Sequence, residues 1–131
     1  MKTDLHIHTY YSDGVFSPEK IVDTAMDVGL EVIALTDHDN VLSYKVATDY
    51  LKKEGKEDKL KIIQGVEINT LYKNYEIHIL GYFMDTSNSD FQNLLKVEIP
   101  KSSYSKYNTI ICETCQAIFV QKFQKPKKKL P

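Results

Sequence analysis

Strand-like and helix-like segments alternate along the first 97 residues of this chain. Residues 3–8 alternate apolar and polar side chains, as a half-buried strand does, and residues 31–36 form a mostly apolar run typical of a buried parallel strand. Two more strands are predicted over residues 60–68 and residues 75–83. This alternation predicts an α/β fold with mainly parallel strands.

Helices are predicted between these strands and after the last one. Ser17 is a plausible N-cap, followed by a proline that suits the first helical position, and Gly29 is a good helix stop. A second helix is expected over residues 43–54. A third is expected over residues 89–97, with Ser89 as its cap.

All four histidines lie in or directly after these predicted strands. His6 and His8 stand two residues apart on the first strand, so both side chains are expected on the same face. His38 follows the second strand, and His78 lies on the fourth. Since α/β folds place active sites at the carboxyl ends of their strands, we expect most of these residues at one such end.

Two carboxylates occupy matching places. Asp13 lies in the loop after the first predicted strand, and Glu67 lies near the end of the third. Imidazole and carboxylate groups together suit Zn²⁺, Mn²⁺ or Fe²⁺. Taken singly, each group has a simpler interpretation: a lone histidine is more often structural, Asp13 is a turn residue before Gly14, and Asp39 is a solvated charge. Taken together they favour metal-assisted hydrolysis.

The motifs, in their order along the chain, resemble those of the PHP (polymerase and histidinol phosphatase) family. The residues that carry the likeness are Asp4–Thr9 with Ser12–Gly14, Thr36–Asp39, Gly65–Ile68 and His78–Tyr82. The likeness covers residues 1–97 and is nearest to small members similar to 3′,5′-nucleoside bisphosphate phosphatases and 5′–3′ exoribonucleases. It implies the N-terminal portion of a distorted (β/α)7 barrel and hydrolysis of a nucleotide or oligonucleotide phosphate ester by a metal-bound water, with no side chain as the nucleophile.

The resemblance also implies two or three divalent ions (Mn, Fe or Zn) and assigns their ligands by position. His6 and His8 would bind the first ion, and Asp13 and His38 the second. Glu67 would bridge two ions, and His78 would bind the third.

The chain departs from the family pattern after residue 97. Residues 1–98 carry 10 Lys and 17 Asp or Glu, whereas residues 99–131 carry 7 Lys and one Glu. No histidine follows His78, although the family pattern continues with further His ligands and a late Asp-x-His motif. We therefore expect a truncated PHP domain over residues 1–97, a basic and poorly ordered tail over residues 98–131, an incomplete barrel, and weak or absent activity.

Other features limit the alternatives. The chain has no Arg, so a substrate phosphate would be held by metal, Lys or backbone N–H groups. Cys112 and Cys115 form a single C-x-x-C, which could be half a zinc site or a redox pair. Because a second ligand pair and a surrounding βαβ pattern are missing, incidental thiols are expected. A cytoplasmic location without a membrane partner is the default, because neither a signal-peptide pattern nor a long apolar run is present. The main alternative is a non-catalytic metal-binding or interaction fragment. A nucleic-acid-binding module using the Lys-rich tail is less favoured, and no stable nucleic-acid partner is predicted.

Overall fold

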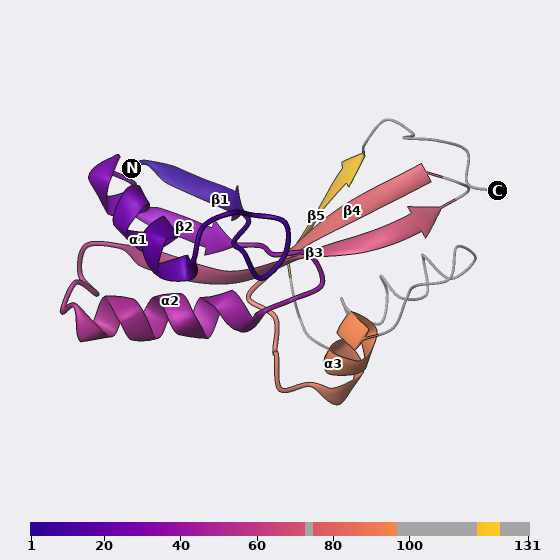
Figure 1. Cartoon of the computed structure of the whole chain (residues 1–131). Coiled ribbons are helices and arrows are strands. Elements are labelled where there is room, and N and C mark those ends of the chain that lie inside the picture. Colours follow the sequence, from indigo (N-terminus) through magenta and orange to yellow (C-terminus); the bar gives the residue numbers. More distant parts are fainter. Residues whose placement is uncertain (73–74, 97–117, 124–131) are drawn as a thin grey trace. The chain divides into compact units, whose positions relative to one another are not determined.

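The computed structural model describes residues 1–72, 75–96 and 118–123, which Figure 1 draws as coloured ribbon. The chain divides into two compact units, Met1–Val66 and Glu67–Pro131. Cys112, Cys115 and the Lys-rich end of the chain lie outside the described residues, so the predictions made for them stay predictions.

The first unit contains a parallel sheet with the order β1-β2-β3. Its strands are β1 (Thr3–Ile7), β2 (Val32–Leu35) and the first part of β3 (Lys61–Tyr72). In register, Val32 of β2 is paired with Thr3 on one side and with Lys61 on the other. The predicted α/β class and its parallel strands are therefore confirmed in this unit.

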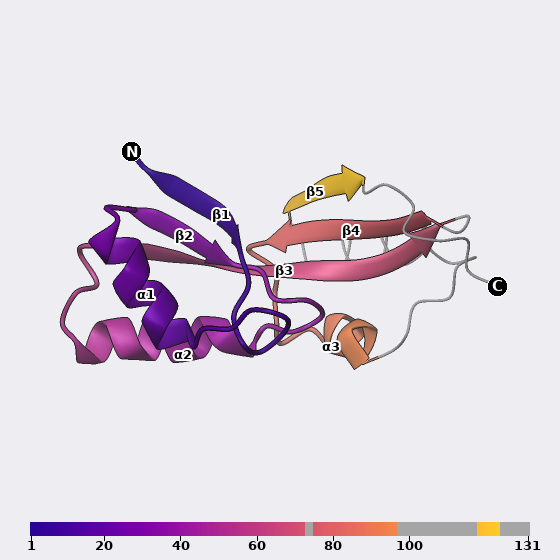
Figure 2. The ribbon, with the colours of Figure 1, turned by 45° about the horizontal axis from the view of Figure 1, so that its top comes forward.

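Two helices connect these strands and lie on the same side of the sheet, as Figure 2 shows. They are α1 (Pro18–Asp27) and α2 (Leu42–Lys53). Ser17 caps α1 as predicted, since its side chain accepts a hydrogen bond from Lys20 N at 3.2 Å. Gly29 follows with a φ of 78°, a left-handed conformation that glycine adopts without steric cost.

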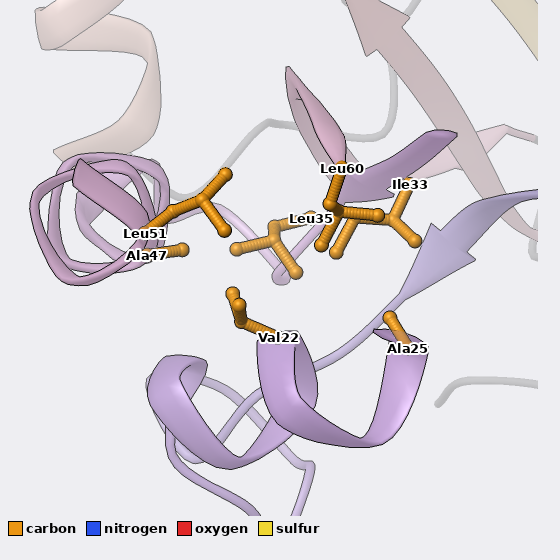
Figure 3. Packing of buried hydrophobic residues seen from close by; sticks show 7 residues of the cluster. All are labelled: Val22, Ala25, Ile33, Leu35, Ala47, Leu51 and Leu60. Atoms are coloured by element: carbon orange, nitrogen blue, oxygen red, sulfur yellow. The ribbon is translucent and has the colours of Figure 1, made fainter. Parts of the chain in front are cut away.

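The core of the first unit lies between the sheet and these helices. Figure 3 shows how side chains from β2, α1 and α2 converge there. Its buried members are Val22, Ala25, Ile33, Leu35, Ala47, Leu51 and Leu60. The Tyr50 hydroxyl also joins the helices by donating a hydrogen bond to Asp23 Oδ1 at 3.0 Å. This packing makes β2 a fixed support for the loops that follow β1 and β2.

The second unit departs from the predicted parallel pattern. It contains the rest of β3, β4 (Tyr75–Tyr82), α3 (Ser89–Lys96) and β5 (Ile118–Phe123). β3 and β4 run in opposite directions (Figure 2), and β4 pairs with β5 antiparallel. β5 falls within the segment expected to be a tail, while the domain boundary at residue 97 stays a prediction.

The cap of α3 is also corrected by the structure. Ser89 was expected to cap it, but Asn88 does so, because Asn88 Oδ1 accepts a hydrogen bond from Phe91 N at 3.0 Å. Ser89 is instead the first residue of the helix.

Among the described residues, no helix combines the length and the apolar character that crossing a membrane requires.

Candidate metal centre

β1 carries two of the predicted ligands on one face. His6 lies within β1, and His8 follows its last residue. Their Nε2 atoms are 3.0 Å apart and their ring centroids 5.0 Å apart. The expectation that the two imidazoles share a face is therefore confirmed. Two ring nitrogens this close can contact the same ion.

Asp13 joins His8 to His38. Its Oδ1 lies 3.1 Å from His8 Nδ1, and its Oδ2 lies 3.3 Å from His38 Nε2. The rings of His8 and His38 are 4.5 Å apart, centroid to centroid. Each of the three residues offers one ligand atom, and these atoms lie within 4.8 Å of one another. The loop after β1 and the loop after β2 thus bring a carboxylate and two imidazoles together.

The charge of this group favours a cation. Desolvation alone would raise the pKa of Asp13, but attraction by His38 and His8 and hydrogen bonds to its carboxylate together lower that pKa below the usual aspartate value. The Asp13 side chain is 68% exposed, whereas the His8 and His38 side chains are each 20% exposed. An ionised carboxylate therefore stands at the solvent side of two half-buried imidazoles.

The loop after β1 is tightly closed. Tyr10 N donates to Phe16 O at 2.9 Å, and Gly14 N donates to Thr9 O at 2.9 Å. A Cβ added at Gly14 would lie 2.5 Å from the carbonyl oxygen of His8. Only glycine fits here, because the loop folds directly onto the backbone of His8. This close approach brings Asp13 back to the end of β1.

A buried carboxylate that the sequence reasoning did not assign supports the same loop. Asp37 is fully buried, and its Oδ1 accepts hydrogen bonds from Thr9 N at 2.6 Å and from Ser12 Oγ at 2.7 Å. Its Oδ2 accepts from the Thr9 hydroxyl at 2.8 Å. The sequence contained one indication of this role: Asp37 follows an apolar strand directly, and an aspartate buried at such a place needs hydrogen-bond donors around it.

The second unit brings together the other two predicted ligands. His78 Nδ1 lies 3.1 Å from Glu67 Oε1, and the side chains of His78 and Glu67 are only 7% and 2% exposed. Glu67 was expected near the end of its strand, but β3 runs on to Tyr72, so Glu67 lies inside it. A buried imidazole and a buried carboxylate in contact can form a hydrogen bond with each other, and both groups are also metal ligands.

The donor chemistry fits divalent transition metals. The first unit supplies His6, His8 and His38 with one carboxylate, and the second supplies one imidazole and one carboxylate. Nitrogen and oxygen ligands without thiolates suit Mn²⁺, Fe²⁺ and Zn²⁺ alike.

Comparison with known proteins gives this arrangement a context. Residues 4–122 match the sequence profile described as the PHP domain. The chain is 37% identical over 92 residues to the 5′–3′ exoribonuclease Rnm of Salmonella typhimurium, a match that covers 70% of this chain and 31% of that protein. It is 30% identical over 82 residues to the 3′,5′-nucleoside bisphosphate phosphatase of Chromobacterium violaceum, covering 63% of this chain and 27% of that protein.

A solved structure agrees with these sequence matches. An amidohydrolase from Chromobacterium violaceum, solved with bound sulfate and no metal, has a TM-score of 0.65 and 28% identity, covering 73% of this chain and 32% of that chain. The chain therefore spans roughly a third of the length of the relatives it matches.

Proposed function

Since the chain belongs to the PHP domain family, we propose that it is a metal-dependent phosphoesterase that hydrolyses a phosphate ester of nucleotide or oligonucleotide type. The observation that carries this proposal is the grouping of His8, Asp13 and His38, with His6 beside His8, in the first unit. The names of the relatives, an exoribonuclease and a nucleoside bisphosphate phosphatase, support the substrate class.

We propose six metal ligands: His6, His8, Asp13, His38, Glu67 and His78. The first four are brought together by the ends of β1 and β2, and the last two face each other in the second unit. Two or three ions of Mn, Fe or Zn fit this number of donors. When bound, such ions lower the pKa of a water molecule and neutralise charge on phosphate oxygens.

The side chains themselves have distinct tasks in this proposal. His6 presents its imidazole from β1, and His8 presents its own from the residue directly after β1, which brings their Nε2 atoms 3.0 Å apart. Asp13 adds negative charge at the solvent side, where a cation and its phosphate substrate would enter. The chain has no Arg, so Lys and backbone N–H groups assist in holding the phosphate.

The test measures metal content and turnover in the same preparation of the full chain. We expect stoichiometric Mn²⁺ or Zn²⁺ and hydrolysis of bis(p-nitrophenyl) phosphate and of a 3′,5′-nucleoside bisphosphate. His6→Ala should abolish both. Asp49→Asn, which alters an exposed carboxylate on α2 paired with Lys45, is the matched control and should change neither.

The outcomes separate the two candidate functions. Stoichiometric metal without turnover would favour the alternative function, a non-catalytic metal-binding fragment, since the match covers only 31% of the exoribonuclease and 27% of the phosphatase. A chain that binds no divalent ion when supplied with Mn²⁺, Fe²⁺ and Zn²⁺ in turn would refute both.

A further inference from the structure

We infer that Asp37 is a positioning residue: its buried carboxylate holds the loop Thr9–Asp13 in place and, through Ser12, orients His8 towards the ion. The inference rests on the proposed function, because it concerns how the ligands of that site are held.

Burial of the Asp37 carboxylate has a free-energy cost that hydrogen bonds must offset. Its side chain is fully buried, and an ionised carboxylate is expensive to bury without donors. Three donors meet it, and all three belong to the loop after β1: the N–H and hydroxyl of Thr9 and the hydroxyl of Ser12. Hydrogen bonds to an ionised acceptor are about twice as strong as neutral ones. Asp37 therefore holds a loop that lies 25 to 28 residues earlier in the chain.

The Ser12 hydroxyl links Asp37 to His8. The Ser12 hydroxyl has one proton, and the nearer acceptor is Asp37 Oδ1 at 2.7 Å rather than Asp13 Oδ1 at 3.5 Å. With that proton used, the Ser12 oxygen can only accept, and it lies 3.4 Å from His8 Nδ1. Asp13 Oδ1, at 3.1 Å, is a second acceptor at the same nitrogen.

With two hydrogen-bond acceptors beside it, Nδ1 of His8 must carry a proton, and this selects one tautomer of the imidazole ring. Nε2 then carries the lone pair. Nε2 is the atom that lies 3.0 Å from His6 Nε2, so its lone pair would be available to an ion held by His6 and His8. Outer hydrogen bonds that fix the tautomer of a ligand histidine are a common feature of metal sites.

Asp37 lies just after the end of β2, in the segment that contacts the end of β1. Asp37 directly precedes the ligand His38, and Thr36 N donates to Ile7 O at 2.8 Å, which joins the ends of β1 and β2. The same short segment therefore carries one ligand and clamps the loop that carries another, Asp13. A change at Asp37 should act on metal binding more than a typical loss of one hydrogen bond would.

The experiment uses the full chain in four variants. Asp37→Asn replaces the carboxylate with a neutral amide, Ser12→Ala removes the hydroxyl that links Asp37 to His8, and Ser12→Thr keeps a hydroxyl at that position. Asp23→Asn is the matched control, because Asp23 also accepts a hydrogen bond within the first unit, from the Tyr50 hydroxyl that joins α1 and α2. Each variant is titrated with Zn²⁺, and its metal-free form is examined by ¹⁵N NMR of the histidine rings above the usual histidine pKa.

We expect Asp37→Asn and Ser12→Ala to lower Zn²⁺ affinity by about 10- to 100-fold and to reduce the share of His8 protonated at Nδ1. Ser12→Thr should bind like the wild type, and so should Asp23→Asn. If Asp37→Asn does not fold, the Ser12 pair still decides, since Ser12 is only partly buried.

Unchanged affinity and unchanged ring signals in Asp37→Asn and Ser12→Ala would overturn the inference while leaving the proposed function intact. Lower stability with unchanged affinity would also overturn it, since Asp37 would then be only structural. If the wild type binds none of Zn²⁺, Mn²⁺ and Fe²⁺, the proposed function is refuted, and the ring signals of the metal-free variants still decide whether Asp37 orients His8.

Discussion

Replacing Gly14 with alanine tests whether the loop after β1 holds the ligands in place. The added Cβ would lie 2.5 Å from His8 O, 2.7 Å from His8 C and 2.9 Å from Thr9 C. All three are backbone atoms, so no side chain can rotate away to make room. Restoring an ordinary contact of 3.4 Å to the oxygen requires that the two backbone segments separate by 0.9 Å.

This separation has a calculable cost. Forcing a methyl group into a filled space costs about 1–3 kcal/mol. If the loop relieves the strain by moving Asp13 away from His8, metal binding must move Asp13 back and restore the strain. The binding free energy then falls by the same amount, which raises the Kd about 5- to 150-fold. We therefore expect Gly14→Ala to lower Zn²⁺ affinity within this range, as measured by isothermal titration calorimetry on the full chain.

Gly55→Ala is the matched control. Gly55 has a φ of 63°, and a Cβ there would meet nothing within 4 Å. Its substitution should cost about 1 kcal/mol of stability through backbone strain alone and leave Zn²⁺ affinity unchanged. If Gly14→Ala binds Zn²⁺ as tightly as the wild type and is equally stable, the loop after β1 does not depend on the close approach of Gly14 to His8.

Three further predictions concern packing, titration and the second unit. Leu35→Ala, at a side chain 1% exposed in the core of Figure 3, should cost about 2–5 kcal/mol in urea denaturation, and a loss under 1 kcal/mol would contradict that packing. The hydrogen bond to Asp23, with burial and nearby negative charges, raises the pKa of Tyr50, so its contribution to stability is full below the ordinary tyrosine pKa and is lost as pH rises through the raised value. Tyr50→Phe should remove this alkaline loss from stability curves measured against pH. Glu67→Ala removes the acceptor facing His78 Nδ1 and should cost about 1–3 kcal/mol in thermal unfolding with chelator present, a cost that Glu67→Gln should largely avoid.

Local signals in the sequence were sufficient for much of the first unit. Ser17 and the proline after it set the start of α1, and the apolar run before Thr36 is β2. The two-residue spacing of His6 and His8 put their rings on one face, because strand geometry leaves no other choice. These predictions held since each depends on neighbours within a few residues.

The prediction of mainly parallel strands left the direction of β4 unassigned, although the sequence limited it. β3 ends at Tyr72 and β4 begins at Tyr75, which leaves two residues between them. A parallel connection needs a dozen or more residues, whereas two suffice for a hairpin. The predicted strands over residues 60–68 and 75–83 also left only residues 69–74 between them, which is too short for a parallel connection, so the hairpin could have been predicted.

The role of Asp37 could not be derived in the same way. Its donors, Thr9 and Ser12, lie 25 to 28 residues away, and nothing in the sequence states which buried acceptor meets which loop. Hydrogen bonds of this kind depend on how β1 and β2 align, and that register includes an irregularity between Asp4 and Ile7. The proposed ligands were named from their residue types and motifs, whereas the hydrogen bonds around them became visible only in the structure.

If Gly14 acts through Asp13, the two positions must be coupled. Asp13 is the most exposed of the four ligands in the first unit, so its place depends on the loop rather than on the core. In a double-mutant cycle, Asp13→Asn should remove most of the effect that Gly14→Ala has on Zn²⁺ affinity, giving a coupling of about 0.5–3 kcal/mol. Gly55→Ala combined with Asp13→Asn should be additive. Additivity in the Gly14 cycle would mean that Gly14→Ala weakens binding through the backbone of His8 instead, because the carbonyl oxygen of His8 is the atom that the added Cβ would approach most closely, at 2.5 Å.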